Sequence, residues 1–268
     1  MSLLTRPATR PAAATRRSFG RLGALATGLA LVALVWSVVA ATGVFPRSLF
    51  PPLSDVGRAG WSMFTAGELI PDIVASLLRA ATGFVIGAVA GFLLAIVTAA
   101  TTTGRLVMQP VLRLFAPIPT IGLVPLAILW FGLGEESKAV VVALGVFVPV
   151  WINSHAGLAT TPTDFLQAAR CLGASRWDTL TRIVIPEAGP DIVAGLRVGA
   201  AMAFVLIVVA EMTGTTNGLG FRIYQSQLFS QADRLIFCLV VLGILGAAVD
   251  QLLARVTVPV TRWAEQER

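Results

Sequence analysis

Charged residues are scarce in this sequence. They make up 13% of its 268 residues, whereas 56% of the residues are apolar, and a soluble domain carries about 25% charge. A soluble protein of this size would still need charge to keep its exterior hydrated. The composition therefore excludes an ordinary soluble enzyme, and it disfavours disorder, which requires low hydrophobicity. It predicts a protein whose solvent is the lipid bilayer.

Lysine is almost absent, because Lys138 is the single lysine of the chain. No Gly-x4-Gly-Lys-Ser/Thr sequence surrounds it, so the chain lacks a Walker A phosphate-binding loop. If ATP drives this protein, another subunit binds the ATP.

Cysteine and histidine are also rare. Cys171 and Cys238 fit neither a disulfide framework nor a metal cluster, and we interpret both as packing residues. His155 is the sole histidine and cannot form a metal site alone. The net charge of +6 does not indicate nucleic-acid binding, because the arginines stand singly between apolar runs instead of forming a basic face. The charge indicates orientation in a membrane.

Six long apolar stretches predict six membrane-spanning helices. A span needs about 18 or more residues that are mostly apolar. Four stretches are uncharged throughout, and they cover residues 22–46, 80–104, 114–134 and 139–163. Two later candidates, at about 191–211 and 235–255, contain Arg197 and Asp250. We therefore predict an all-α, polytopic integral membrane protein.

The distribution of basic residues predicts the orientation. With six spans both termini lie on one side, and the 20 Lys and Arg residues divide fourteen to six in favour of that side. The positive-inside rule then places both termini in the cytoplasm, and we expect a bacterial inner-membrane protein.

The N-terminal sequence permits two interpretations. Arg16 and Arg17 before an apolar run resemble a twin-arginine export signal, or they form the charged flank of a retained first helix. The run exceeds the about 7–15 apolar residues of a cleavable signal, which favours the retained helix. We divide the chain into a cytoplasmic arm at 1–21, a first span with its external loop at 22–74, a core at 75–256 that includes a polar loop at 160–190, and a cytoplasmic tail at 257–268.

The third predicted span is unusually rich in proline. Pro117, Pro119 and Pro125 lie within it, and proline at membrane depth frees carbonyls that must be satisfied by neighbours or by water in a cavity. We therefore expect this segment to pack inside the bundle, and we treat these three prolines as gate or pathway candidates.

The polar loop after the fourth span predicts two short helices. Asp164 with Gln167 resembles a capping box, and Gly173 suits a C-terminal αL cap. Ser175 with Asp178 starts the second helix in the same way, and we expect Pro186 to end it.

The first of these helices has an apolar face. Phe165, Ala168, Ala169 and Leu172 recur at positions i, i+3, i+4 and i+7. A helix this short has little core of its own to cover, so we expect it to dock in a groove on another protein.

These residues resemble a known family. Gln167-Ala168-Ala169, Gly173 after three more residues, and Ile183-Val184-Ile185-Pro186 after a further nine resemble the Glu-Ala-Ala loop of ABC-importer permease subunits. The sequence departs from that family at Gln167, where glutamate is usual, and at Ile185, where leucine is usual. Pro117-Ile118-Pro119, the stretch VPLAILWFGLGEESK, and Glu211 followed by Gly218-Leu219-Gly220 are similar to its nitrate, sulfonate and taurine branch.

The resemblance covers about residues 75–256 and implies a type I ABC-importer permease-like bundle. It makes the loop at 160–190 the coupling segment that docks on a separate ATPase. The ATPase-coupling residues that it implies are Phe165, Gln167, Ala168, Ala169, Leu172, Gly173, Ile185 and Pro186.

The resemblance also implies the partners and the solute. The partners are a second copy of the permease, a dimer of ABC ATPase subunits and an external solute-binding protein, all at a lipid bilayer and without nucleic acid. ATP and magnesium would bind to the ATPase, so we expect no catalytic residue, cofactor or metal in this chain. The solute would be a small anion such as nitrate, a sulfonate or taurine.

Glu211 lies inside a predicted span. A charge at the bilayer centre costs about 2.5–3.5 kcal/mol on insertion scales, so we expect Glu211 to face the bundle interior or to lie near the external end. A structural ion pair or cap and a role in the pathway both stay open. We expect Arg197 to snorkel to the cytoplasmic surface and Asp250 to be structural or interfacial.

Two other functions compete with the importer subunit. An ion-coupled secondary transporter would show inverted repeats and discontinuous midplane helices with ionisable residues, and neither is evident. A membrane enzyme would need a catalytic motif, but the sequence contains no His-Glu-x-x-His, no Gly-x-Ser-x-Gly and no second histidine. The permease subunit is therefore our leading prediction.

Overall fold

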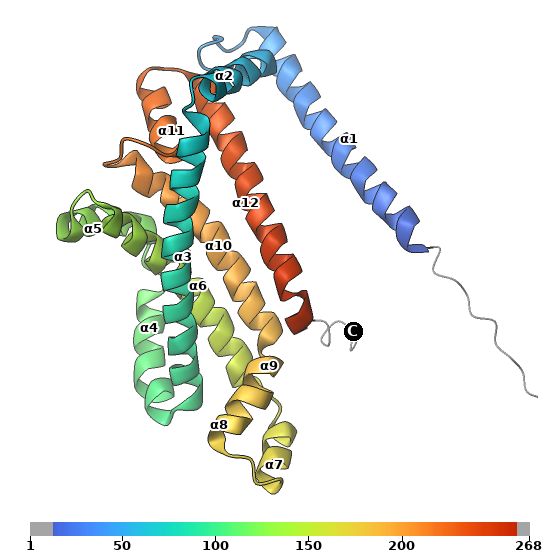
Figure 1. Cartoon of the computed structure of the whole chain (residues 1–268), viewed down its shortest axis with the longest axis vertical. Helices are drawn as coiled ribbons and strands as arrows, with labels where there is room; N and C mark the ends of the chain where they lie inside the picture. Colours follow the sequence, from blue (N-terminus) through green and yellow to red (C-terminus); the bar gives the residue numbers. More distant parts are fainter. Residues whose placement is uncertain (1–12, 262–268) are drawn as a thin grey trace, which may run out of the picture.

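The computed structural model describes residues 13–261, without the side chains of residues 13–22, 25 and 259–261. All regular elements in this part of the chain are helical (Figure 1), which confirms the predicted all-α class. Four helices are long and apolar enough to cross a membrane, namely α3 (Leu69–Ala100), α6 (Glu135–Ala159), α10 (Gly189–Met212) and α12 (Ala232–Thr261).

The centre of the bundle is formed by α3, α6 and α10, with α6 packed against both of the others. Glycines spaced four apart on α3 allow this close approach. A Cβ added at Gly83 or Gly87 would lie 2.5 Å from Val142 or 2.3 Å from the Ala143 carbonyl oxygen, both on α6. Small residues at this spacing let helix backbones come together in a membrane.

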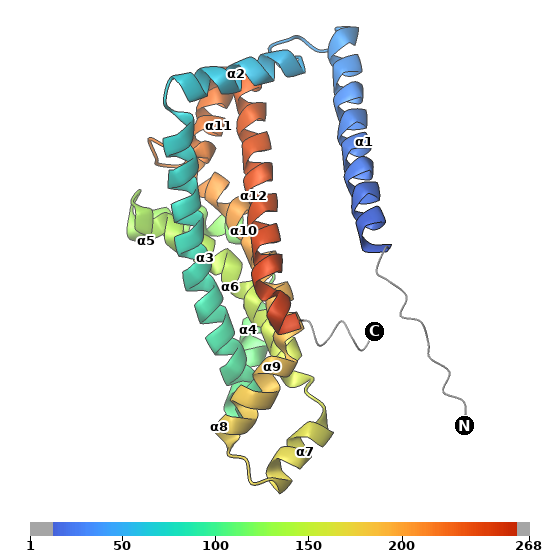
Figure 2. The ribbon, with the colours of Figure 1, turned by 45° about the vertical axis from the view of Figure 1, so that its right-hand side comes forward.

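One end of the bundle is closed by two shorter helices, α2 (Leu53–Thr65) and α11 (Leu219–Leu228). Figure 2 shows α2 lying across the end of α12. The buried cluster of this end includes Met63, Leu219, Ile223 and Cys238, so Cys238 is a packing residue as expected. Cys171 is exposed, and its interpretation as a packing residue is wrong. We call it the α2 end.

The opposite end carries α7 (Thr163–Cys171), α8 (Arg176–Thr179), η3 (Leu180–Val184) and α9 (Ile185–Glu187). A third buried cluster, which includes Trp151, Leu158 and Ala188, anchors these short helices to the ends of α3 and α6. We call this the α7 end.

The third predicted span is broken. The chain forms η1 (Gly104–Met108) and α4 (Gln109–Phe115), turns, and continues as η2 (Thr120–Leu123) and α5 (Val124–Phe131), with a bend of 84° between the two halves. Pro119 lies in the turn with an extended backbone, φ −64° and ψ 110°, and it has no N–H to continue the helix. The six-span count is therefore approximate, because the described residues contain four long spans, or five if the bent pair is one.

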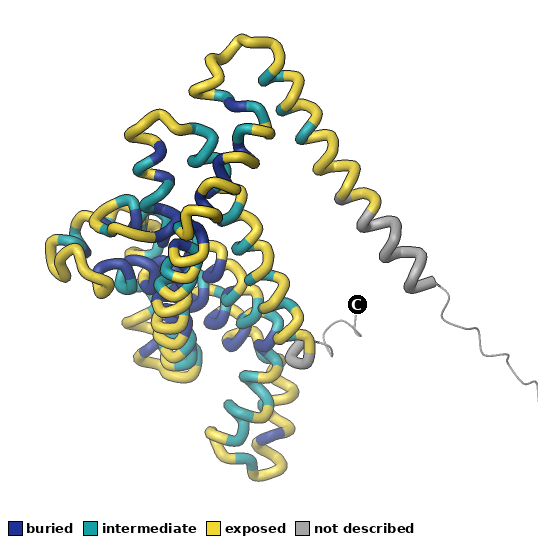
Figure 3. Tube along the Cα trace, turned by 45° about the horizontal axis from the view of Figure 1, so that its top comes forward, coloured by how far each residue is buried: buried dark blue, intermediate teal, exposed yellow. Residues whose placement is uncertain are grey.

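The first predicted span corresponds to α1 (Ala13–Thr42), whose apolar part is Ala26–Thr42. Figures 1 and 2 show α1 standing apart from the other helices, and most of its described residues are exposed in Figure 3. Trp36 ties it to the following loop by stacking on Phe50 at 4.2 Å and donating a hydrogen bond to the Pro51 carbonyl.

The helix ends differ from the predicted segment boundaries. The arm predicted at 1–21 contains the start of α1, and α12 continues beyond residue 256 into the predicted tail. The remainder of both segments, 1–12 and 262–268, lies outside the described residues.

Candidate functional site

The first helix of the polar loop, α7, begins at Thr163. Pro162 precedes it and provides no side-chain cap, so the predicted capping box of Asp164 and Gln167 is wrong. Asp164 lies inside the first turn instead, where a carboxylate interacts favourably with the helix dipole.

The end of α7 confirms the predicted glycine cap. Gly173 has a φ of +74°, and its N–H donates to the Arg170 carbonyl at 3.0 Å while the Ala174 N–H donates to the Ala169 carbonyl at 3.0 Å. This pair of bonds is the Schellman motif, which satisfies the last carbonyls of a helix. A Cβ added at Gly173 would meet nothing within 4 Å, so the requirement for glycine is conformational.

The second helix begins as predicted. The Ser175 hydroxyl accepts a hydrogen bond from the Asp178 N–H at 3.1 Å and donates one to the Asp178 carboxylate at 2.5 Å. The hydroxyl lowers the pKa of Asp178, and the charge of Arg182, 3.4 Å away, acts in the same direction.

The predicted stop at Pro186 is one residue early, because the chain stays helical through Pro186 to Glu187. The wide turn η3, in which the Ile185 N–H bonds to the Leu180 carbonyl, precedes the proline. Such a turn shifts the hydrogen-bond register and accommodates a residue without an N–H.

A groove of about 450 Å³ lies between α7 and the η3–α9 segment. We call it the α7 groove, and its lining is Phe165, Ala168, Ala169, Leu172, Arg182, Ile183, Pro186 and Glu187. Phe165 and Leu172 are 50% and 86% exposed, and neighbouring exposed apolar side chains of this kind are typical of a protein interaction site. The groove therefore presents an apolar surface that this chain leaves uncovered.

The structure brings together five of the eight predicted coupling residues in this groove, namely Phe165, Ala168, Ala169, Leu172 and Pro186. Gln167 and Gly173 are exposed outside it, and Ile185 packs into the cluster around Trp151 instead. Ala169 is buried by its own chain, whereas Ala168 is exposed.

Sequence reasoning missed two groove residues of opposite charge, Arg182 and Glu187. Arg182 directly precedes the Ile183–Pro186 segment and Glu187 directly follows it. Their position next to this motif could have identified them as groove residues. They give the apolar groove a charged rim.

The three proline candidates lie along the broken span. Pro117 and Pro119 are exposed in the turn between α4 and η2, and Pro125 lies in the first turn of α5. Val124 and Ala127 of α5 are buried in the central cluster, whereas α4 has no buried residue and all three prolines are exposed. The expectation that this segment packs inside the bundle is therefore confirmed only for one face of α5.

Glu211 is fully buried near the α2 end, where α3, α10 and α11 meet. It accepts hydrogen bonds from the Ser76 hydroxyl at 2.8 Å, from Arg79 at 2.8 Å and from the Gly220 N–H at 2.9 Å. Arg79 also forms a bidentate pair with Glu135 of α6. This placement favours the ion-pair and cap interpretation of Glu211.

Asp72 completes this polar cluster. It accepts a hydrogen bond from the Gly218 N–H at 2.7 Å and pairs with Arg222 at 2.6 Å. Gly218 has a φ of +112°, and a Cβ there would lie 2.5 Å from the Glu211 carboxyl carbon. The Gly218-Leu219-Gly220 sequence thus allows two carboxylates to reach the first N–H groups of α11.

Arg197 and Asp250 form a pair that the sequence did not predict. Arg197 of α10 binds Asp250 of α12 through two hydrogen bonds of 2.7 and 2.8 Å. A bidentate pair lowers the free-energy cost of placing two charges within membrane spans. Because Arg197 is paired with Asp250, its charge does not need to reach the membrane surface by snorkelling.

Comparison with known proteins gives one family match. Residues 83–258 match the family described as "Binding-protein-dependent transport system inner membrane component". The chain is 28% identical over 248 residues to the putative aliphatic sulfonates transport permease protein SsuC of Bacillus subtilis, covering 92% of this chain and 90% of that protein. It is 30% identical over 240 residues to the taurine transport system permease protein TauC of Escherichia coli, covering 88% and 87%.

The fold is also similar to that of a solved transporter chain. A chain from inward-facing MetNI methionine ABC transporter matches with a TM-score of 0.61 at 20% identity, over 74% of this chain and 98% of that one. This similarity confirms the expected fold, that of an ABC-importer permease.

Proposed function

The chain belongs to the family of binding-protein-dependent transport system inner membrane components, and on that premise we propose that it forms the solute pathway of an ATP-driven importer and couples it to a separate ATPase. The observation that carries the proposal is the α7 groove. Its large apolar side chains are exposed at the end of the bundle, and a second protein would remove them from water.

The ATPase is the partner that fits this groove. Phe165 and Leu172 supply apolar anchors, and the rim charges Arg182 and Glu187 supply orientation. With no Walker A sequence in this chain, ATP and magnesium would bind to the partner, which would carry the hydrolysis. The groove would transmit closure of the ATPase to α9 and, through it, to α10.

We place the α7 end in the cytoplasm, together with both chain termini. The arginine distribution supports this orientation in a bacterial inner membrane. A solute-binding protein would then deliver its cargo at the α2 end.

We propose a second copy of this chain as the partner in the membrane. The apolar residues Leu29, Leu31, Val32 and Val35 are exposed along α1, which stands apart from its own bundle (Figure 2). A second copy would cover part of this surface and complete the pathway between two bundles. Pro117, Pro119, Pro125 and Glu211 remain our gate or pathway candidates, with the broken span as the hinge.

The proposed solute is a small sulfonate, such as taurine or an aliphatic sulfonate. The similarity to SsuC, an aliphatic sulfonates permease protein, and to TauC, a taurine permease protein, supports this class, and nitrate is the other small anion that the sequence motifs suggest. Selectivity among these anions would reside mainly in the binding protein.

Reconstitution tests this proposal. Proteoliposomes containing the chain and its ATPase, supplied with the binding protein, should accumulate labelled taurine or ethanesulfonate only when ATP is present on the ATPase side. Uptake by the chain alone, driven by an ion gradient, would overturn the proposal in favour of a secondary transporter. Selective uptake of nitrate would support the importer proposal but overturn the proposal that the solute is a sulfonate.

A further inference from the structure

A second and larger cavity lies at the α7 end, on the side of α7 and α8 that faces the spans. Its volume is about 1300 Å³, and it is open on one side and lined by the end of α3, η1, α4, the end of α6, and the α7–η3 segment. Its inner wall includes Thr98, Trp151 and His155, all at least nine-tenths buried. Trp151 donates to the Thr98 hydroxyl at 3.1 Å, and that hydroxyl lies 3.0 Å from His155 Nδ1. These bonds give the cavity a fixed polar wall.

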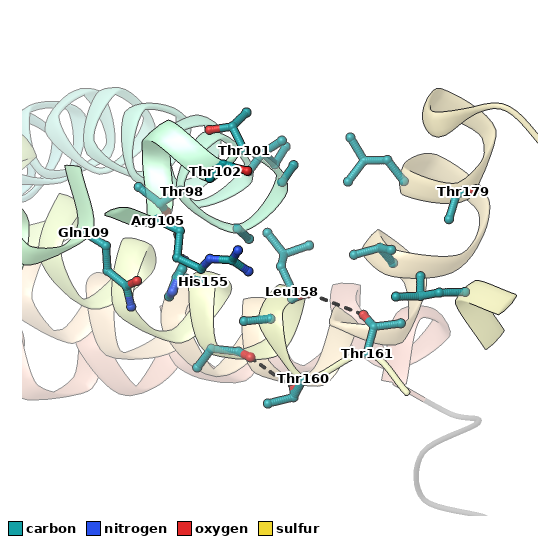
Figure 4. A pocket seen from close by; sticks show the side chains of 18 of the residues that line it. Thr98, Thr101, Thr102, Arg105, Gln109, His155, Leu158, Thr160, Thr161 and Thr179 are labelled. Atoms are coloured by element: carbon teal, nitrogen blue, oxygen red, sulfur yellow. Dashed lines mark hydrogen bonds between the residues drawn. The ribbon is translucent and has the colours of Figure 1, made fainter. Parts of the chain in front are cut away.

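The lining of this cavity is cationic. Arg105, Arg113, Arg170 and Arg176 line it from four elements, and no Asp or Glu among the described residues does so. Figure 4 shows the Arg105 side chain reaching from η1 into the cavity, with Gln109 and His155 on the same side and Thr160 and Thr161 opposite. Guanidinium, amide and imidazole groups from separate elements thus face one space.

The positive-inside rule accounts for arginines at this end of the bundle, but it does not account for their convergence on a cavity without acidic groups. Arg182 and Arg197, also at the α7 half, are each paired with an aspartate. Within the described residues, the four cavity arginines have no carboxylate within 4.0 Å, and Asp178 nearby is engaged by Ser175 and Arg182. Their charge is therefore available to an anion.

We propose that this cavity binds a small tetrahedral oxyanion, the group that sulfonates, sulfate and phosphate esters have in common. Guanidinium groups bind such anions through paired, charge-assisted hydrogen bonds, and Gln109 adds neutral donors. The site is separate from the α7 groove and goes beyond the proposed function, because it would bind an anion without any ATPase. The anion has two candidate sources, a solute sulfonate and the phosphate of a lipid headgroup.

The test uses the full-length chain in nanodiscs of phosphatidylcholine. Titration with ethanesulfonate or sulfate, at constant ionic strength maintained with chloride, should raise the melting temperature and give saturable binding. Arg105→Gln and Arg113→Gln should each weaken this binding by about tenfold or more, as expected for loss of a charged hydrogen bond. The matched control is Arg58→Gln on α2, which removes an exposed arginine far from the cavity and should leave binding unchanged.

A second set of nanodiscs containing phosphatidylglycerol separates the two sources, because its phosphate carries a net negative charge, whereas choline neutralises the phosphate of phosphatidylcholine. If the anionic headgroup occupies the site, these discs should abolish the sulfonate titration of the wild-type chain, and Arg105→Gln should weaken the binding of phosphatidylglycerol. If the solute is the ligand, the titration should be the same in both discs. The proposal is overturned if wild-type chain binds neither anion, or if the Arg105 and Arg113 variants bind as wild type does. If Arg105→Gln fails to fold, anion binding by Arg113→Gln tests the proposal. Both binding measurements are independent of transport activity.

Discussion

Gly173 shapes the end of α7 through its backbone alone. Because its φ is +74° and the space around a Cβ is open, Gly173→Val should destabilise the Schellman turn by about 1–2 kcal/mol without a clash. Gly173→Asn should be tolerated, because asparagine adopts the αL conformation. Hydrogen exchange of α7 amides in the purified chain measures the effect, with faster exchange expected for the valine variant only. Equal protection in both variants would show that the cap does not hold α7.

Glu211 tests the polar cluster at the α2 end. Glu211→Gln removes a fully buried carboxylate and leaves Arg79 partly unpaired, which should cost about 3–5 kcal/mol. Glu135→Gln is the matched control, because it removes the other carboxylate that binds Arg79, but Glu135 is 62% exposed and Arg79 keeps its bond to Glu211. Thermal unfolding in detergent should therefore show a much larger loss for Glu211→Gln. Similar losses in the two variants would contradict the structural role.

Short-range sequence patterns predicted the roles of individual capping residues, whereas contacts between residues far apart in the sequence were not predictable. The Ser175 cap and the Gly173 turn depend on hydrogen bonds between residues no more than five positions apart, so their spacing reveals them. The bond between Ser76 and Glu211 joins positions 135 residues apart, and no periodicity in the chain encodes it. The burial of Ala169 similarly depends on how α7 folds back toward η3.

At the scale of the element, the broken span shows where hydropathy is insufficient. The stretch at 114–134 has the length and apolarity of a span, yet its prolines produce an 84° bend. Hydropathy measures how favourably a segment transfers into lipid, and it carries no information about the direction of the helix axis. The prolines were visible in the sequence, whereas the angle depends on how α5 packs against α6.

This bend predicts a measurable distance. Spin labels at the exposed positions Leu114 and Leu129, in a Cys171→Ser background, should lie closer than the roughly 22 Å expected along a straight helix of the same length. Replacing both Pro117 and Pro119 with alanine should shift the distribution toward that value, because α4 can then continue. The control distance is the one between labels at Leu129 of α5 and Leu144 of α6, both exposed. This distance tests whether α5 stays in position on α6. A straight-helix distance in the wild type would contradict the bend.

At the scale of the whole molecule, the sequence predicted the all-α class and the short helices of the polar loop, and the structure supplied the asymmetry between the two ends. At the α2 end, the buried carboxylates Glu211 and Asp72 pair with Arg79 and Arg222, and the exposed Glu135 of α6 also binds Arg79. The α7 end carries the α7 groove and four cavity arginines that have no carboxylate partner among the described residues. Charged groups are thus paired within the chain at the α2 end, whereas the α7 end leaves charges for a partner or ligand.

The central claim is that the α7 groove holds the ATPase, and native mass spectrometry of the detergent-extracted assembly tests it most directly. Leu172→Glu places a charge at the most exposed apolar position of the groove, where docking would bury it at a cost of several kcal/mol. Leu228→Glu, at another exposed leucine, which lies at the end of α11 and outside the groove, is the matched control. We predict two chains with two ATPase subunits for the wild type and the control, and two chains without ATPase for Leu172→Glu. Retention of both ATPase subunits by the Leu172→Glu assembly would contradict the claim.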